Sequence, residues 1–195
     1  MKTLKKSTVR TIIIFLIIVL CIIGYYTYLS GRKRETANDG KMTTVQLILS
    51  RDLANDYPPT VKEVIKYYVD IQKCFYNEEC TDEEVEQLGL KARELYDDEL
   101  LAINEESENL LRLKADIASF KAGKKQIGSV AVASSVNVDT FQEDGYEFSR
   151  IQCTYSLIEN GQSSLSSTVY LLRRDENRRW KIYGWDLSKN VNPTD

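Results

Sequence analysis

At 195 residues, with 43% hydrophobic and 28% charged side chains, the chain has the size of one domain with an appendage and the composition of a globular protein. It contains no histidine, which removes the usual general base near neutral pH and the commonest metal ligand, and so disfavours an enzyme. Seven cationic and two acidic side chains give residues 1–40 a charge of +5. Since the whole chain carries −3, the remainder carries −8, a distribution that argues against nucleic-acid binding.

Residues 11–29 predict a transmembrane helix. An unbroken apolar run from Ile12 to Ile23 lies within them, and a span of about 18 residues is near the minimum for crossing a bilayer core. Tyrosines follow the run, where amphipathic rings favour the lipid–water interface. A cleaved signal peptide is the alternative, but cleavage needs small residues after the run, and residues 25–29 are bulky throughout. We therefore expect an uncleaved signal anchor.

The anchor divides the chain into a leader (1–10), the transmembrane helix (11–29), a polar stalk (30–42), a folded domain (43–190) and a tail (191–195). Four cationic side chains precede the helix and three follow it, so the positive-inside bias is slight. A short leader before a long domain favours a cytoplasmic N-terminus. The expected location is therefore the cell membrane, single-pass, with the domain extracytoplasmic and the lipid bilayer contacted through residues 11–29.

Three to four helices are predicted between residues 43 and 123. A short helix over 43–53 ends before Pro58 and Pro59, which cannot continue it. Capping boxes at residues 60–63 and 81–84 begin two further helices. Gly89 marks a break, Asn104 is a cap for the next helix, and Gly123 ends it.

After Gly123 the apolar period changes from helical to two. Four runs alternate in this way, and the turn pairs Asp144-Gly145 and Asn160-Gly161 are strong hairpin signals. The runs are Val130–Val138, Ile151–Leu157, Leu165–Leu171 and Trp180–Ile182. We therefore expect an α+β domain in which the helices cover one face of a curved four-stranded antiparallel sheet.

This order of elements resembles the nuclear transport factor 2-like cone fold, and residues 179–185 (RWKIYGW) resemble its last strand. More specifically, the chain is similar to an uncharacterised family of membrane-anchored proteins of Gram-positive gut anaerobes. The similar segments are 57–60, 67–68, 74–79, 89–97 and 180–185. The resemblance covers nearly the whole chain. It implies a cell-envelope location and brings no catalytic residue, cofactor or metal.

Two surfaces and one pocket are candidate sites. Acidic side chains crowd residues 77–109, where a solvated helical face is the simplest explanation and a docking surface the alternative. Five cations bracket the last predicted hairpin and could meet an acidic partner, namely Arg173, Arg174, Arg178, Arg179 and Lys181. Four aromatic residues are candidates to line an apolar pocket inside the cone, although core packing explains them equally well, namely Tyr68, Tyr155, Trp180 and Tyr183.

The cysteines give no site of their own. Cys21 lies in the predicted anchor, and Cys74, Cys80 and Cys153 lie in the domain. Pairing of Cys74 with Cys80 would require the helix to end between them, so free, buried thiols are the expectation. The sequence offers no catalytic motif, metal site or cofactor site.

Three functions remain, in order. The first is a membrane-anchored protein-interaction or scaffolding domain that binds a partner or a second copy. The alternative is a binding domain for a small apolar ligand or peptide in the cone pocket, and an enzyme of unknown type is third. An open pocket would favour the ligand, whereas a cone filled by Tyr155 and Trp180 would count against it.

Overall fold

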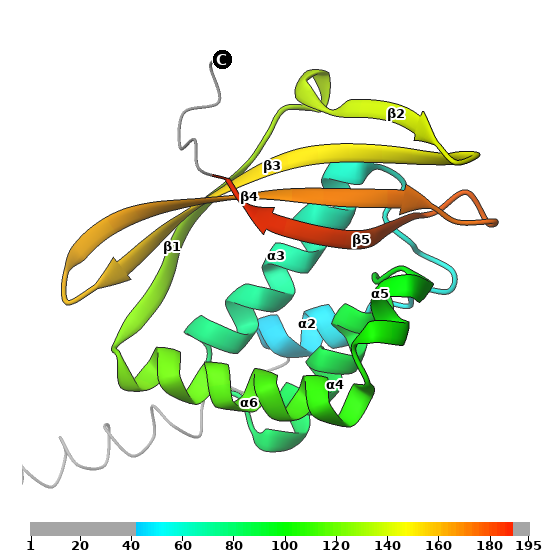
Figure 1. Cartoon of the computed structure of the whole chain (residues 1–195). Helices are drawn as coiled ribbons and strands as arrows, with labels where there is room; N and C mark the ends of the chain where they lie inside the picture. Colours follow the sequence, from blue (N-terminus) through cyan, green and yellow to red (C-terminus); the bar gives the residue numbers. More distant parts are fainter. Residues whose placement is uncertain (1–41, 189–195) are drawn as a thin grey trace, which may run out of the picture. The chain divides into compact units, whose positions relative to one another are not determined.

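The computed structural model describes residues 42–188, which form one compact unit from Thr43 onward (Figure 1). The predicted leader, transmembrane helix and tail lie outside the described residues, as does the predicted stalk except for Met42. Within residues 42–188, no helix has both the length and the apolar character that crossing a membrane requires.

The domain is α+β, as predicted. Helices come first and strands second along the described chain, and Figure 1 shows the helices on one face of the sheet. The helices are α2 (Thr44–Ser50), α3 (Val61–Asn77), α4 (Asp82–Arg93), α5 (Asp98–Ile103) and α6 (Glu106–Ala122). The strands are β1 (Lys125–Val132), β2 (Asp139–Glu143), β3 (Tyr146–Glu159), β4 (Gln162–Arg174) and β5 (Trp180–Leu187).

The sheet has five antiparallel strands rather than the four predicted. Its order is β1-β3-β4-β5, and β2 pairs with β3 as well. The predicted run Val130–Val138 is broken by a short 3-10 helix at Ser135–Asn137, where Val136 is exposed. Valines fall on both sides of the break, so the period-two pattern continues across it. The sequence therefore predicts one strand where the structure has two.

The predicted inward face of β4 is also wrong. Alternation over Leu165–Leu171 puts Leu165 and Leu171 on the inward face. Pairing places Tyr170 opposite the buried Ile151, so Tyr170 and Leu172 face the core, while the predicted Leu165 is exposed. Residues 169–172 are apolar without interruption, and such a run does not reveal which side chains point inward. The register with β3, whose inward residues were predicted correctly, decides it.

Helix starts follow the capping signals closely. At Thr81 the box is complete, because the Glu84 N–H donates to Thr81 Oγ1 at 3.2 Å and the Thr81 N–H donates to Glu84 Oε2 at 2.8 Å. Asn104 is a correction, since it follows the last residue of α5, and the side chain of Glu105 caps α6 instead. Gly89 is a second correction: it lies inside α4, where Leu110 of α6 packs against it.

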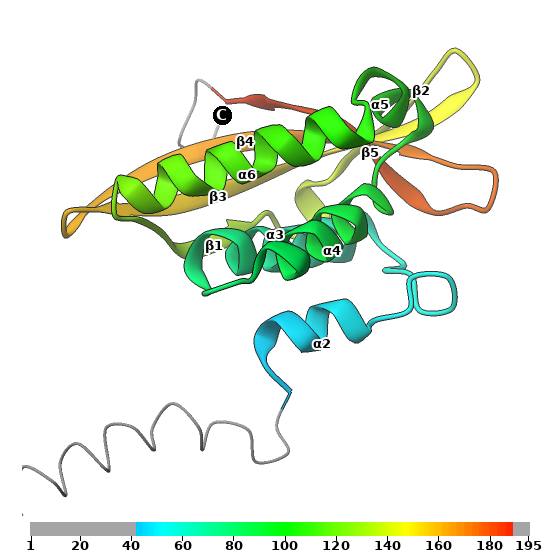
Figure 2. The ribbon, with the colours of Figure 1, turned by 90° about the horizontal axis from the view of Figure 1, so that it is seen from below.

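The core lies between α3 and the sheet. Val64, Ile65 and Ile71 of α3 are fully buried against Leu172 and Ile182. Helix α6 contributes much less, because Ile117 is its only buried residue. In Figure 2, which views the domain from below, α6 crosses in front of β3 and β4, and its contacts with the sheet are mainly to β1.

Candidate functional site

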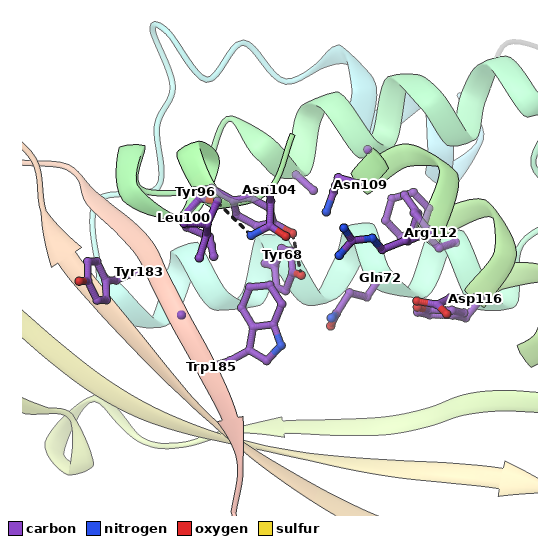
Figure 3. A pocket seen from close by; sticks show the side chains of 17 residues that line it. Tyr68, Gln72, Tyr96, Leu100, Asn104, Asn109, Arg112, Asp116, Tyr183 and Trp185 are labelled. Carbon is purple, nitrogen blue, oxygen red and sulfur yellow. Dashed lines mark hydrogen bonds between the residues drawn. The ribbon is translucent and has the colours of Figure 1, made fainter. Parts of the chain in front are cut away.

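A cavity of about 590 Å³ lies between the helices and β5 (Figure 3). Its lining comes from α3, α4, α5, α6 and β5, so every layer of the domain contributes. The lining includes Tyr68, Gln72, Phe75, Tyr76, Tyr96, Leu100, Ile103, Asn104, Asn109, Arg112, Leu113, Asp116, Tyr183 and Trp185.

Helix α6 forms the polar wall. Asn109, Arg112 and Asp116 are spaced by three and four residues, which places them on one helical face. Figure 3 shows them along one side of the cavity, with Trp185 on the other. Leu110 and Leu113 pack against Gly89 of α4, where a Cβ would come within 2.5 Å of Leu110 Cδ2. This close packing fixes α6 against α4, and the polar face of α6 lines the cavity.

Aromatic rings form the opposite wall. Tyr68, Tyr96 and Trp185 lie together, with ring centroids 5.9 Å apart for Tyr68–Tyr96 and for Tyr96–Trp185. The Tyr68 and Tyr96 hydroxyls are hydrogen-bonded at 3.1 Å. Burial raises the pKa of Tyr68 well above its ordinary value and also raises the pKa of Tyr96. Both phenols therefore stay neutral near pH 7 and serve as hydrogen-bonding and packing groups.

The four predicted pocket residues divide into two pairs. Tyr68 and Tyr183 line the cavity, and Tyr183 donates its hydroxyl to Glu99 Oε2 at 2.8 Å. Tyr155 is buried behind the cavity, where its hydroxyl donates to Gln72 Oε1 at 2.8 Å. Trp180 is buried beneath the guanidinium of Arg174, 5.1 Å from its ring centroid.

Most of the lining was not predicted from the sequence, although the sequence contains two signals of it. Gln72 stands on the otherwise apolar inner stripe of α3, and a polar residue in such a stripe marks a site that needs a partner or water. The second signal was the polar series on α6. Trp185 gave no signal, because the irregular pairing near Leu171 and Leu172 decides where it points.

Most of the predicted cationic surface is used within the domain. Arg173 Nε donates to Asp97 Oδ2 at 2.9 Å, and Arg174 Nη1 donates to Glu147 Oε2 at 2.9 Å. Arg179 Nη2 donates to the Ala54 carbonyl, and Lys181 Nζ donates to the Glu94 carbonyl, each at 2.6 Å. The side chain of Arg178 is exposed and makes no hydrogen bond or ion pair with residues 42–188.

The domain cysteines are free thiols in an inert setting. Cys80 Sγ donates to the Cys74 carbonyl at 3.3 Å, and no disulfide joins the two. Burial raises the pKa of Cys74 to about 12 and that of Cys153 to about 11, so neither is a thiolate near neutral pH. In the part of the chain that the structure describes, no three metal-ligating side chains come together.

Comparison with known proteins shows the family to which the chain belongs. No curated protein matches the sequence. Residues 1–185 match a family described as a domain of unknown function, DUF6715. Because the match includes almost the whole chain, the protein belongs to the DUF6715 family.

Proposed function

We propose that residues 43–188 form a binding domain for a small, largely apolar molecule. The observation that carries the proposal is the open cavity of about 590 Å³ beneath α6, a size within the range of roughly 300–1,000 Å³ that is usual for ligand pockets. Its composition also fits: aromatic rings supply contact area, and amide side chains at Asn104 and Asn109 can orient a ligand.

The aromatic residues that could have closed the pocket do not close it. Tyr155 and Trp180 are both buried, but they pack behind and beside the cavity rather than in it. Gln72 links the two regions, because it lines the cavity and accepts the hydrogen bond from Tyr155. A cone filled by Tyr155 and Trp180 would have opposed ligand binding, and this packing removes that objection.

Binding is better supported than catalysis. Asp116 is the carboxylate among the lining residues, and it is exposed rather than buried beside a second acid or base. The tyrosine pKa values are raised by burial, which keeps the phenols protonated. A general base works best with a pKa near the operating pH, and these groups move away from it.

The proposal includes the architecture and location expected from the sequence. The succession of helices and a long antiparallel sheet, with a pocket between them, supports a nuclear transport factor 2-like cone. The apolar run in residues 11–29 supports a membrane anchor that holds this domain on the extracytoplasmic side. Such a tether would confine ligand capture to the membrane surface.

A retained ligand tests the binding function directly. The full chain, extracted from its producing cells in mild detergent, is examined by native mass spectrometry and is expected to carry one small additional mass. Asn109→Trp places a large ring on the cavity side of α6 and is expected to remove that mass. Leu111→Trp is the matched control, because Leu111 is 71% exposed on the same helix. A bare wild-type chain, or a mass that survives Asn109→Trp, contradicts the proposal.

Protein interaction through the last hairpin is the second candidate. The observation that favours it is the exposed Arg178, which stands at the β4–β5 turn with φ of 60°. It ranks second because the other four cations of the predicted surface are bonded inside the domain.

Charge reversal at the hairpin tip tests this second candidate. Arg178→Glu is expected to weaken self-association or partner capture several-fold, measured by light scattering and by crosslinking in membranes. Lys124→Glu is the control, since Lys124 is also an exposed cation at a turn with positive φ. If both variants associate like the wild type, the hairpin is not a contact surface.

A further inference from the structure

One of the two charges in the cavity lining has no ion-pair partner among the described residues. Two charged side chains contribute to the lining, Arg112 and Asp116, both from α6. The guanidinium of Arg112 is ion-paired with Glu108, with Nη2 and Oε2 2.7 Å apart. The carboxylate of Asp116 makes no ion pair or hydrogen bond with the described residues, and Lys114, its neighbour on the helix, pairs with Glu86 instead. The uncompensated charge of the lining is therefore negative.

Like the negative charge of Asp116, the aromatic wall would attract a cation. The faces of aromatic rings attract cations, and tryptophan does so most strongly. Elsewhere in the domain such faces are occupied: Arg174 lies over Trp180, and Arg179 and Lys181 lie over Tyr57. No cation of residues 42–188 lies over Trp185, although its side chain is 48% exposed and lines the cavity.

The carboxylate and the rings line one cavity, so a single ligand could contact both. Asp116 lines the same cavity as Tyr68, Tyr96 and Trp185, and Figure 3 shows it on the side opposite Trp185. Tyr76 lines the cavity together with Phe75, on the side of α3 that faces α6. The remaining lining is apolar at Leu100, Ile103 and Leu113, which suits a hydrocarbon body.

We infer that the cavity takes an organic cation, an apolar molecule that carries a protonated amine or a quaternary ammonium group. Its charge is balanced by the Asp116 carboxylate and by the open face of Trp185, and its apolar body packs against the leucines. This inference rests on the proposed ligand-binding function and adds the chemical class of the ligand.

The test compares three probes that share one phenyl body. These are 2-phenylethylammonium, 2-phenylethanol and 3-phenylpropionate, which are cationic, neutral and anionic near pH 7. The full chain is placed in nanodiscs of zwitterionic lipid, and empty nanodiscs report the partitioning of each probe into lipid. Binding is followed by tryptophan fluorescence, from which the signal of empty nanodiscs is subtracted. Within this chain it arises from Trp180 and Trp185, and the Trp185→Phe variant identifies the signal from the cavity.

The cation is expected to bind about tenfold more tightly than the anion, with the neutral probe between them. Asp116→Asn is expected to remove most of that difference while leaving the affinity for the neutral probe unchanged. Glu143→Gln is the matched control, because it removes one negative charge from an exposed position on β2, outside the cavity. This control should preserve the preference.

The outcomes separate this inference from the function on which it rests. Equal binding of the three probes, or tighter binding of the anion, overturns the cationic class and leaves ligand binding standing. A preference that persists in Asp116→Asn and disappears in Glu143→Gln also overturns it, since the cavity charge would not be its source. If no probe binds up to millimolar concentration, both the inference and the proposed function fail.

Discussion

Asp97 holds the junction between the helical layer and the sheet. Its side chain caps α5 by accepting a hydrogen bond from the Glu99 N–H at 3.0 Å, and its own N–H donates to the Ile182 carbonyl at 2.9 Å. The carboxylate also receives Arg173, whose guanidinium stacks over Tyr146 and Tyr183. Arg173, a candidate contact residue on sequence grounds, is thus a buried connection between β4 and the start of α5.

Removing Arg173 should therefore be costly. Its side chain is 11% exposed and that of Asp97 is 4% exposed, so Arg173→Ala would leave a buried carboxylate without its partner. We expect a loss of about 3–5 kcal/mol in the free energy of unfolding, measured by urea denaturation. Arg150→Ala is the control, because the Arg150–Asp139 pair is 53% and 63% exposed and should contribute at most about 1 kcal/mol. Equal losses in the two variants would show that the buried pair has no special role.

At the scale of elements, local signals predicted what local physics controls. The start of α4 follows from Thr81 and Glu84, whose side chains satisfy backbone groups three residues apart. The β3–β4 turn follows from Asn160 and Gly161, which adopt φ of 50° and 78°. A two-residue hairpin turn of type I′ requires a positive φ at both central residues. Neither feature depends on distant parts of the chain, so the sequence was sufficient.

Features set by contacts between elements were missed. Gly89 suggests a helix break when read alone, yet it continues α4 because Leu110 of another helix needs the space beside it. The inward side chains of β4 depend on register with β3, which the uninterrupted apolar run does not encode.

The candidate site belongs to this second class. Tyr68 was predicted because it lies on the apolar stripe of α3, a local property. Asp116 and Trp185 were not predicted, since their positions depend on how α6 lies over the sheet and on the irregular β4–β5 pairing. A cavity is a property of packing between layers, and a single sequence read for periodicity gives no measure of it.

At the scale of the whole molecule, most titratable groups buried in the described domain are phenols and thiols, and Asp97, paired with Arg173, is the exception. The Tyr155 hydroxyl contacts that of Tyr170 at 2.7 Å, and both residues are buried. Burial raises the pKa of Tyr67 to about 12 and the pKa values of Tyr155 and Tyr170 still further. The chain has no histidine, so no side chain has an ordinary pKa between 5 and 8.

The stability of the domain should therefore be flat near neutral pH and should fall under alkaline conditions. A tyrosine with a raised pKa in the folded state stays protonated there, whereas the unfolded chain loses that proton above about pH 10. The unfolded state then binds fewer protons than the folded state, and the free energy of unfolding decreases as pH rises. Cys74, with a pKa raised to about 12, adds the same effect from about pH 9.

Urea unfolding followed by circular dichroism from pH 6 to pH 11 measures this dependence. We expect a constant midpoint to about pH 8 and a progressive decrease above about pH 9. Tyr155→Phe should make the decrease shallower, because one buried phenol no longer titrates on unfolding. Tyr146→Phe is the control, since Tyr146 is 50% exposed and should leave the slope unchanged. A urea midpoint that rose with pH above 9 would contradict a core of neutral phenols. It would mean that the folded state ionises its phenols more readily than the unfolded chain does.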